Sequence, residues 1–381
     1  MLAAAVVLGA GGWWLGYPEL AVLSTGCLAA ALAGACWLLL GVSLKITREV
    51  APAKVPRGSA AVATVRVTNT GRRATRPLAA TDSCGATTVR VDLPGLARGA
   101  SRFVSYRLAT GRRGEFGIGP LVLHTADPLG LFRRVRLYGE PATLLVRPRT
   151  VPLPALASGR TASIEGPASD TAPSGTVTFH ALREYVMGDD LRHVHWRTTA
   201  RTGTLMVRQL VDSSLPVTTV VLDTRCAAYP DEDAARQDAA AACDFDIAVD
   251  AVATVAASMA SAGFPVTVLT TDGTRQESRS ARTAGTLLDR LALVETSTDG
   301  DLATTLETVR RFAADGSITV VTGSAASLPG DTLGACRRRF DRAVVIVAGR
   351  GTGPVPVLPV TVIRAASAED VAAAWRRDGP R

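Results

Sequence analysis

The stretch VTTVVLD at residues 217–223 decides the fold class, because its apolar and β-branched residues run on without polar alternation. Such continuous runs are typical of parallel strands that are buried on both faces. Four similar runs follow: PVTVLTT (265–271), SITVVTG (317–323), RAVVIVA (342–348) and PVTVI (359–363). Helical patterns separate several of them, at residues 233–262, 282–293 and 302–314. Residues 216–381 therefore predict a doubly wound α/β domain.

A domain of this class holds its ligand crevice at the carboxyl ends of the strands. Neither GxxxxGK[ST] nor GxGxxG follows any of the five runs. The Gly-rich turns that cradle phosphates are thus missing, and nucleotide binding is not predicted.

Residues 46–150 show a different pattern, in which apolar and polar residues alternate in short runs such as VATVRVTN (62–69) and FVSYRLA (103–109). Turn-forming sequences such as Asn69-Thr70-Gly71 and Asp127-Pro128-Leu129-Gly130 separate these runs. Alternation buries one face of each strand, so we expect a two-sheet β-sandwich. Residues 151–177 are rich in Pro, Ser, Gly, Ala and Thr, and we expect an exposed linker there.

The N-terminus predicts a transmembrane helical hairpin over residues 1–45. Residues 20–44 carry no charge and are long enough to cross a bilayer, whereas the apolar residues 2–16 span only about 22 Å as a helix. That first span is either short or begins upstream of Met1, and a cleaved secretory signal is the less favoured alternative. Basic residues follow from Lys45 onward, so we expect two spans in the plasma membrane, with both termini and the soluble domains cytoplasmic.

Charge and cysteine content narrow the function classes. Residues 46–215 carry 24 Lys and Arg against 12 Asp and Glu, and residues 216–381 carry 17 against 21. We expect the basic half to contact anionic lipid of the inner leaflet. Nucleic acid is not an expected partner, because the aromatic residues of this half fall mostly in core-like alternation. The six cysteines show no CxxC spacing, which fits a reduced compartment without a disulfide framework.

The segment REYVMGDDLRHVHWRTTAR at residues 183–201 concentrates chemically versatile side chains. His193 and His195 alternate as on a strand, and with Asp189 or Asp190 they could ligate a metal or serve a membrane-tethered hydrolase. The surrounding arginines disfavour a divalent cation. We therefore favour a structural role, in which residues 178–215 join the domains.

In the structural interpretation, each buried arginine needs a carboxylate partner, and Asp189, Asp190 and Glu184 are near in sequence. Bidentate bonds between arginine and carboxylate fix direction as well as distance, and Trp196 offers a face for a guanidinium. The segment is then a buried clasp between two domains rather than a catalytic centre.

The spacing within this segment is long and specific. It resembles the signature of the bacterial "domain of unknown function 58" family. The matching residues are Arg183, Tyr185, Gly188, Asp189, Asp190, Arg192, His195, Trp196, Arg197 and Arg201.

This resemblance implies a von Willebrand factor A-like C-terminal region and a MoxR-type AAA+ ATPase as partner, together with other membrane or envelope proteins. Such regions often hold Mg²⁺ through an Asp-x-Ser-x-Ser loop. The corresponding stretch here is Asp223-Thr224-Arg225-Cys226-Ala227, in which only the aspartate matches. Thr304 could add an oxygen, but we expect no cofactor, with Asp223 paired to Arg225 or capping a turn. The expected function is a non-enzymatic adaptor, and the tethered hydrolase is the alternative.

Overall fold

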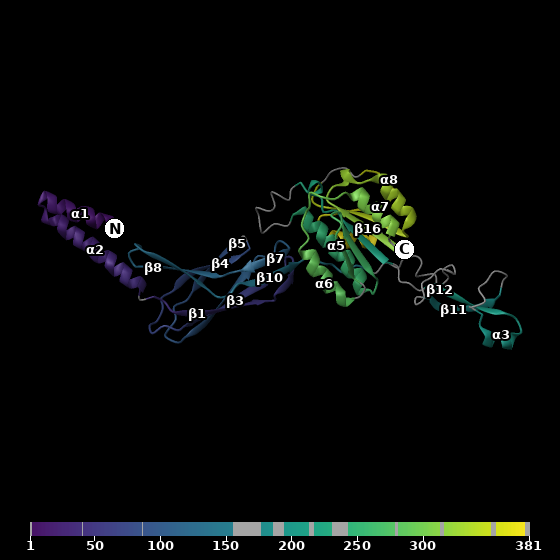
Figure 1. Ribbon diagram of the computed structural model, residues 1–381, viewed down its shortest axis with the longest axis horizontal. Coiled ribbons are helices and arrows are strands. Elements are labelled where there is room, and N and C mark those ends of the chain that lie inside the picture. Colours follow the sequence, from purple (N-terminus) through teal and green to yellow (C-terminus); the bar gives the residue numbers. More distant parts are fainter. Residues whose placement is uncertain are drawn as a thin grey trace. The chain divides into compact units, whose positions relative to one another are not determined.

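The computed structural model describes residues 2–39, 41–85, 87–154, 177–185, 194–212, 217–230, 243–278, 281–312, 316–351 and 356–377. The chain divides into two compact units, of which the first contains Met1–Arg147 and the second begins at Pro148 (Figure 1).

Two apolar helices, α1 (Leu2–Leu15) and α2 (Pro18–Leu39), lie side by side at the start of the first unit (Figure 1). The Ser24 hydroxyl donates a 2.6 Å hydrogen bond to the carbonyl of Ala5, which links the two helices. Among the described residues, Pro18–Trp37 of α2 forms the one helix long and apolar enough to cross a membrane, whereas α1 is shorter. The predicted end of the second apolar segment at Leu44 is wrong, because Leu44 begins a strand and is buried in the next domain.

The β-rich part of the first unit consists of two sheets. The strands of the smaller sheet are antiparallel in the order β1-β3-β6: β1 (Leu44–Ala51), β3 (Ala61–Asn69) and β6 (Ser101–Leu108). The larger sheet has the order β2-β10-β7-β4-β8-β9, with β5 paired to β4. Its strands are β2 (Lys54–Pro56), β4 (Leu78–Cys84), β5 (Thr87–Leu93), β7 (Gly114–Ile118), β8 (Leu121–Ala126), β9 (Arg133–Tyr138) and β10 (Ala142–Arg147). Val65 and Val67 of one sheet share a core with Leu121 and Leu123 of the other, which is the two-sheet packing that the alternating runs predict.

A buried ion pair joins the two sheets. Arg48 of β1 points inward, like Ile46 and Leu44, which lie two and four residues before it. Its Nη2 donates to both carboxylate oxygens of Asp82 on β4, at 2.8 and 2.7 Å, and the side chains of Arg48 and Asp82 are only 3% and 0% exposed. The Tyr106 hydroxyl donates to the same carboxylate, and burial together with Asp82 raises the pKa of Tyr106. Arg48 is therefore not one of the surface charges that could meet lipid.

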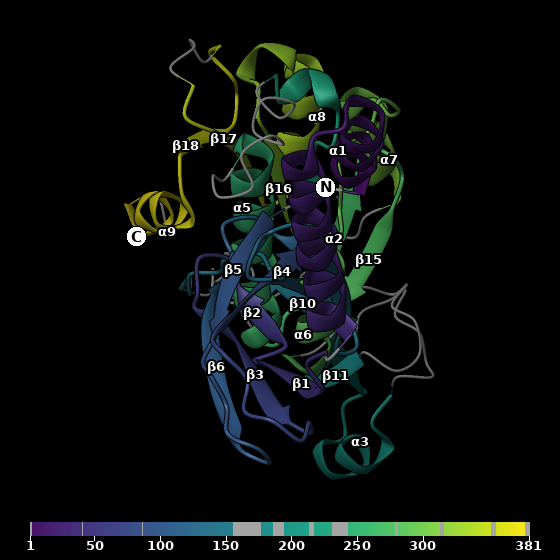
Figure 2. The ribbon, with the colours of Figure 1, turned by 90° about the vertical axis from the view of Figure 1, so that its left-hand side faces the viewer.

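The second unit is built on a six-stranded sheet in the order β15-β14-β13-β16-β17-β18 (Figures 1 and 2). All neighbours are parallel except β15 and β14, which are antiparallel. The strands are β13 (Val217–Leu222), β14 (Val266–Thr270), β15 (Arg275–Ser278), β16 (Gly316–Thr322), β17 (Arg342–Ala348) and β18 (Thr361–Ala365). Counted along the chain, this is the order 3-2-1-4-5-6 of a doubly wound sheet.

Helices cover both faces of this sheet. Helices α5 (Asp244–Ser261), α6 (Ala281–Ala292) and α9 (Ala368–Arg377) share one apolar core with it. The other face packs against α7 (Leu302–Phe312) and α8 (Gly330–Arg339). The five predicted strands are present, but β15, α8 and α9 were not predicted. Residues 233–242 of the predicted long helix lie outside the described ranges.

Residues 149–153 are bound to helix α5. The backbone N–H groups of Arg149, Val151 and Leu153 donate to side chains of α5. Their acceptors are Asp250, Thr254 and Ser258, at 2.8, 3.4 and 3.0 Å respectively. Two residues of extended chain cover nearly the same length as four residues of an α-helix, about 6–7 Å. Every second N–H of this segment therefore meets every fourth side chain of α5. The predicted exposure is thus wrong for Leu153, which is buried on α5, whereas Pro152 and Pro154 are exposed.

A two-stranded antiparallel sheet, β11 (Val177–Glu184) with β12 (Met206–Asp212), precedes β13. The short helix α3 (Trp196–Thr202) lies between its strands in sequence (Figure 1).

Candidate functional site

The predicted signature falls on β11, α3 and the chain between them. Arg183 lies on β11, Tyr185 follows that strand, and its N–H donates to the Leu205 carbonyl at 2.8 Å. The predicted members Gly188, Asp189, Asp190, Arg192 and His193 lie outside the described residues. The pairing of the acidic residues with arginine therefore stays a prediction, as does the hydrolase alternative.

His195 begins α3 as its N-cap. Its Nδ1 accepts a hydrogen bond from the Thr198 N–H at 3.3 Å and lies 2.8 Å from the Thr198 hydroxyl. The helix ends at Gly203, whose φ of 74° lies in the left-handed region that favours glycine. His195, one residue of the resemblance, thus has a local structural role at the start of this helix.

The neighbouring signature residues are on the surface. Trp196 is 67% exposed, and Arg197 and Arg201 are also exposed. The seven-residue helix α3 has no buried residue. The prediction of a buried clasp is therefore wrong for these three side chains, since α3 extends from a two-stranded sheet rather than from a core.

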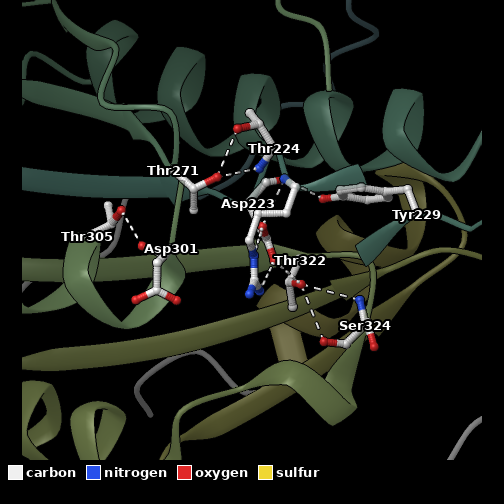
Figure 3. A network of polar contacts seen from close by, with 9 residues as sticks. Asp223, Thr224, Tyr229, Thr271, Asp301, Thr305, Thr322 and Ser324 are labelled. Atoms are coloured by element: carbon white, nitrogen blue, oxygen red, sulfur yellow. Dashed lines mark hydrogen bonds and ion pairs between the residues drawn. The ribbon is translucent and has the colours of Figure 1, made fainter. Parts of the chain in front are cut away.

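A second polar site lies at the carboxyl edge of the six-stranded sheet (Figure 3). Asp223 directly follows β13 and is fully buried. Its Oδ1 accepts from Arg225 Nε and its Oδ2 from Arg225 Nη2, both at 2.8 Å. The Thr322 hydroxyl at the end of β16 donates to Oδ2 at 2.8 Å, and the Arg225 N–H donates to Oδ1 at 3.2 Å. Both carboxylate oxygens are therefore occupied by groups of the chain itself.

The adjoining strand ends are tied to this centre (Figure 3). Thr271, which follows β14, accepts a 2.9 Å hydrogen bond from the Thr224 N–H. The Tyr229 hydroxyl donates to the Asp223 carbonyl at 2.8 Å. In a doubly wound sheet the switch point lies between the first and fourth strands, which here are β13 and β16. The Asp223–Thr322 hydrogen bond crosses that point.

Asp301 borders the same edge and caps α7. Its Oδ2 accepts from the N–H and the hydroxyl of Thr304, each at 2.9 Å. These two bonds lower the pKa of Asp301, and the positive charge of Arg225 adds to the effect. The hydrogen bonds that Arg225 donates to Asp223 raise the pKa of Arg225.

The residues present do not fit the magnesium site that the resemblance implies. A divalent ion would need the Asp223 oxygens, which hold the Arg225 guanidinium, and Thr304 is committed to Asp301. Arg225 and Ala227 stand in the two serine positions, and neither offers a side-chain oxygen. Within the described ranges, no group of three or more His, Cys, Asp or Glu side chains could hold a metal ion. The pairing of Asp223 with Arg225, expected as the alternative to metal binding, is the arrangement found.

Three of the solved structures that match this chain resemble it only distantly. The CARDB domain of a Pyrococcus furiosus protein is 15% identical, and the match covers 28% of this chain and 93% of that domain with a TM-score of 0.23. The putative ApaA protein from Bordetella pertussis is 18% identical over 29% of this chain and 95% of that one, at a TM-score of 0.20. Cwp6 from Clostridium difficile is 9% identical over 88% of this chain and 56% of that one, at a TM-score of 0.19. Likenesses at these TM-scores carry no argument on function.

The comparison with family models identifies one family. No curated protein matches the chain. Residues 181–362, from β11 to β18, match the family described as "Protein of unknown function DUF58". This range contains the signature residues from Arg183 to Arg201 and the carboxyl-edge site at Asp223. Residues 181–362 of the chain belong to the DUF58 family.

Proposed function

We propose that this chain is a membrane-anchored, non-enzymatic adaptor, whose C-terminal domain is of the von Willebrand factor A type and docks a partner at the carboxyl edge of its sheet. The observation that supports this most is the occupation of both Asp223 oxygens by Arg225. A carboxylate neutralised in this way is a poor general base and a poor metal ligand, because the guanidinium cannot give up its charge. This edge then recognises a partner by its shape and charge and does not catalyse a reaction.

The loops at this edge support docking because they are held in place before any partner arrives. The Cys226 N–H donates to the Ser297 carbonyl at 3.0 Å, and the Ser297 N–H donates to the Thr224 carbonyl at 2.7 Å. Cys226, Ala227, Asp299 and Asp301 are exposed beside these bonds. A preorganised surface loses little conformational entropy when it binds.

The proposed partner is a MoxR-type AAA+ ATPase, together with other membrane or envelope proteins, and this choice rests on the family resemblance alone. The proposed location is the plasma membrane, with two spans and the soluble domains in the cytoplasm. The length and apolarity of α2 support one of those spans. The basic residues that follow it, such as Lys45 and Lys54, favour a cytoplasmic side by the positive-inside rule.

Capture of the ATPase by the full-length protein in detergent tests this proposal, with ATP, with ADP and without nucleotide. Asp299→Arg reverses a charge on the proposed docking edge. Asp341→Arg makes the same change at an exposed position that precedes β17, at the opposite edge of the sheet. We expect capture by the wild type and by Asp341→Arg, and loss of capture with Asp299→Arg. Recovery of no AAA+ protein in any nucleotide state contradicts the proposal.

A further inference from the structure

A cavity of about 710 Å³ lies in the first unit, where residues 41–43 lead from α2 into β1. The turn at residues 71–77, which follows β3, lines part of the cavity, and β8 and β9 line another part. The volume falls within the roughly 300–1,000 Å³ range of small-molecule sites. None of the candidate site residues discussed above, in the signature or at the carboxyl edge, lines this cavity.

The lining of the cavity is strongly basic. Among its described lining residues none is Asp or Glu, whereas five are arginines: Arg72, Arg73, Arg76, Arg134 and Arg136. Arginine keeps its charge at any physiological pH, and its planar guanidinium suits bidentate contacts to phosphate oxygens. The cavity therefore favours a phosphate-bearing anion over a neutral or cationic ligand.

Hydrogen bonding and stacking hold two of these arginines in place. Arg136 Nη1 donates to the Val42 carbonyl at 2.9 Å and so fixes the chain that leaves α2. The Arg76 guanidinium lies over the Trp37 ring, 5.1 Å from its centroid. Arg72 and Arg73 lie on the same turn as Arg76, line the cavity and are exposed to solvent. The cationic wall is thus built partly from fixed groups, which lowers the entropic cost of holding an anion.

Trp37 also gives the level of the cavity relative to a membrane. It is the last residue of the segment Pro18–Trp37 that is apolar enough to cross a bilayer, and it lines the cavity. Tryptophan is enriched at the height of lipid headgroups. With α2 in the membrane, as proposed above, a cavity lined by this residue would lie where lipid phosphates are concentrated.

We propose that this cavity binds the phosphate headgroup of an anionic phospholipid of the surrounding membrane. The inference rests on the membrane anchoring in the proposed function, but not on its ATPase partner. Lipid in this cavity would fix the β-sandwich against the bilayer through Arg72, Arg73 and Arg76.

Native mass spectrometry of the delipidated full-length protein in nonionic detergent measures this directly. Dioleoylphosphatidylglycerol is titrated against dioleoylphosphatidylcholine, and the affinity for the first bound lipid is determined. We expect phosphatidylglycerol to bind more tightly. The triple variant R72Q/R73Q/R76Q should lose about fivefold in affinity for each arginine removed, which corresponds to the roughly 1 kcal/mol that one basic side chain contributes near anionic lipid.

The matched control R337Q/R338Q/R339Q removes three exposed arginines from α8 in the second unit, and it should bind lipid like the wild type. R73Q/R134Q, with one change on the turn and one on β9, provides a second test if the triple variant does not fold. Equal affinity for the two lipids, or equal loss in the control, overturns the proposal. Displacement of phosphatidylglycerol by 10 mM inorganic phosphate assigns the cavity to a soluble phosphate compound and also overturns it. The triple variant should still capture the ATPase, so failure of lipid binding and failure of the adaptor proposal give different results.

Discussion

The buried ion pair between Arg48 and Asp82 gives a stability prediction whose size follows from the structure. Replacing Asp82 by alanine leaves the Arg48 guanidinium buried between two sheets without its carboxylate. Removing one partner of a buried pair costs about 3–5 kcal/mol. Arg48 Nη1 keeps its bonds to the carbonyls of Ile118 at 2.9 Å and Glu140 at 3.1 Å, so we expect the lower end, about 3 kcal/mol.

The same domain contains a matched control. Arg90 and Asp92 form an ion pair of similar length, 3.0 Å, but their side chains are 73% and 76% exposed. Exposed pairs contribute about 0–1 kcal/mol, so Asp92→Ala should change the stability little. Hydrogen exchange of peptides from β3 and β4 in the full-length protein, followed over a urea series, measures the free energy of unfolding for this domain. A difference between Asp82→Ala and Asp92→Ala below about 1 kcal/mol refutes the reasoning, because the buried charge would then cost no more than the exposed one.

Two further predictions concern the second unit. Ser258→Ala leaves the buried N–H of Leu153 without its 3.0 Å acceptor and should destabilise the unit by about 1–3 kcal/mol. Ser261→Ala, at an exposed position of the same helix, should have a smaller effect, and thermal melts compare the two variants. His195→Ala removes the N-cap of α3 and should raise amide exchange in that helix, with a cost of about 1 kcal/mol. His195→Asn should restore the cap, whereas an activity lost in both variants would revive the hydrolase alternative.

The sequence predicts the second unit's sheet well, because strands buried on both faces need continuous apolar runs. It does not predict β15, whose sequence RQES is short, polar and at the edge. It places the end of the second apolar helix too late, because VSL at residues 42–44 is as apolar as the helix before it. Only the register between β1 and β3 shows that Leu44 belongs to a sheet, opposite Asn69.

Some contacts of the candidate sites can be predicted from the sequence, and others cannot. Asp223 and Arg225 are two residues apart, so their pairing could be anticipated from the sequence alone. Arg48 and Asp82 lie on different sheets, and the sequence offers no signal for their contact beyond the inward position of Arg48 on an alternating strand. The cavity arginines likewise come from a turn and from β9, which meet only through the pairing of β4 with β8 and of β8 with β9.

In the proposed function, Arg225 takes the place of a metal ion at the switch point of the sheet, and this edge docks a partner instead of performing chemistry. Thermal unfolding of the full-length protein with and without 5 mM Mg²⁺ tests this most directly, alongside Arg225→Ser, which restores the first serine of an Asp-x-Ser-x-Ser loop. The account predicts the same unfolding temperature with and without Mg²⁺ for the wild type, because both Asp223 oxygens already hold a cation. Arg225→Ser should be less stable without Mg²⁺, since Asp223 is then buried without its partner. A wild-type protein whose unfolding temperature rises with Mg²⁺ but not with Na⁺ at equal ionic strength would contradict the claim.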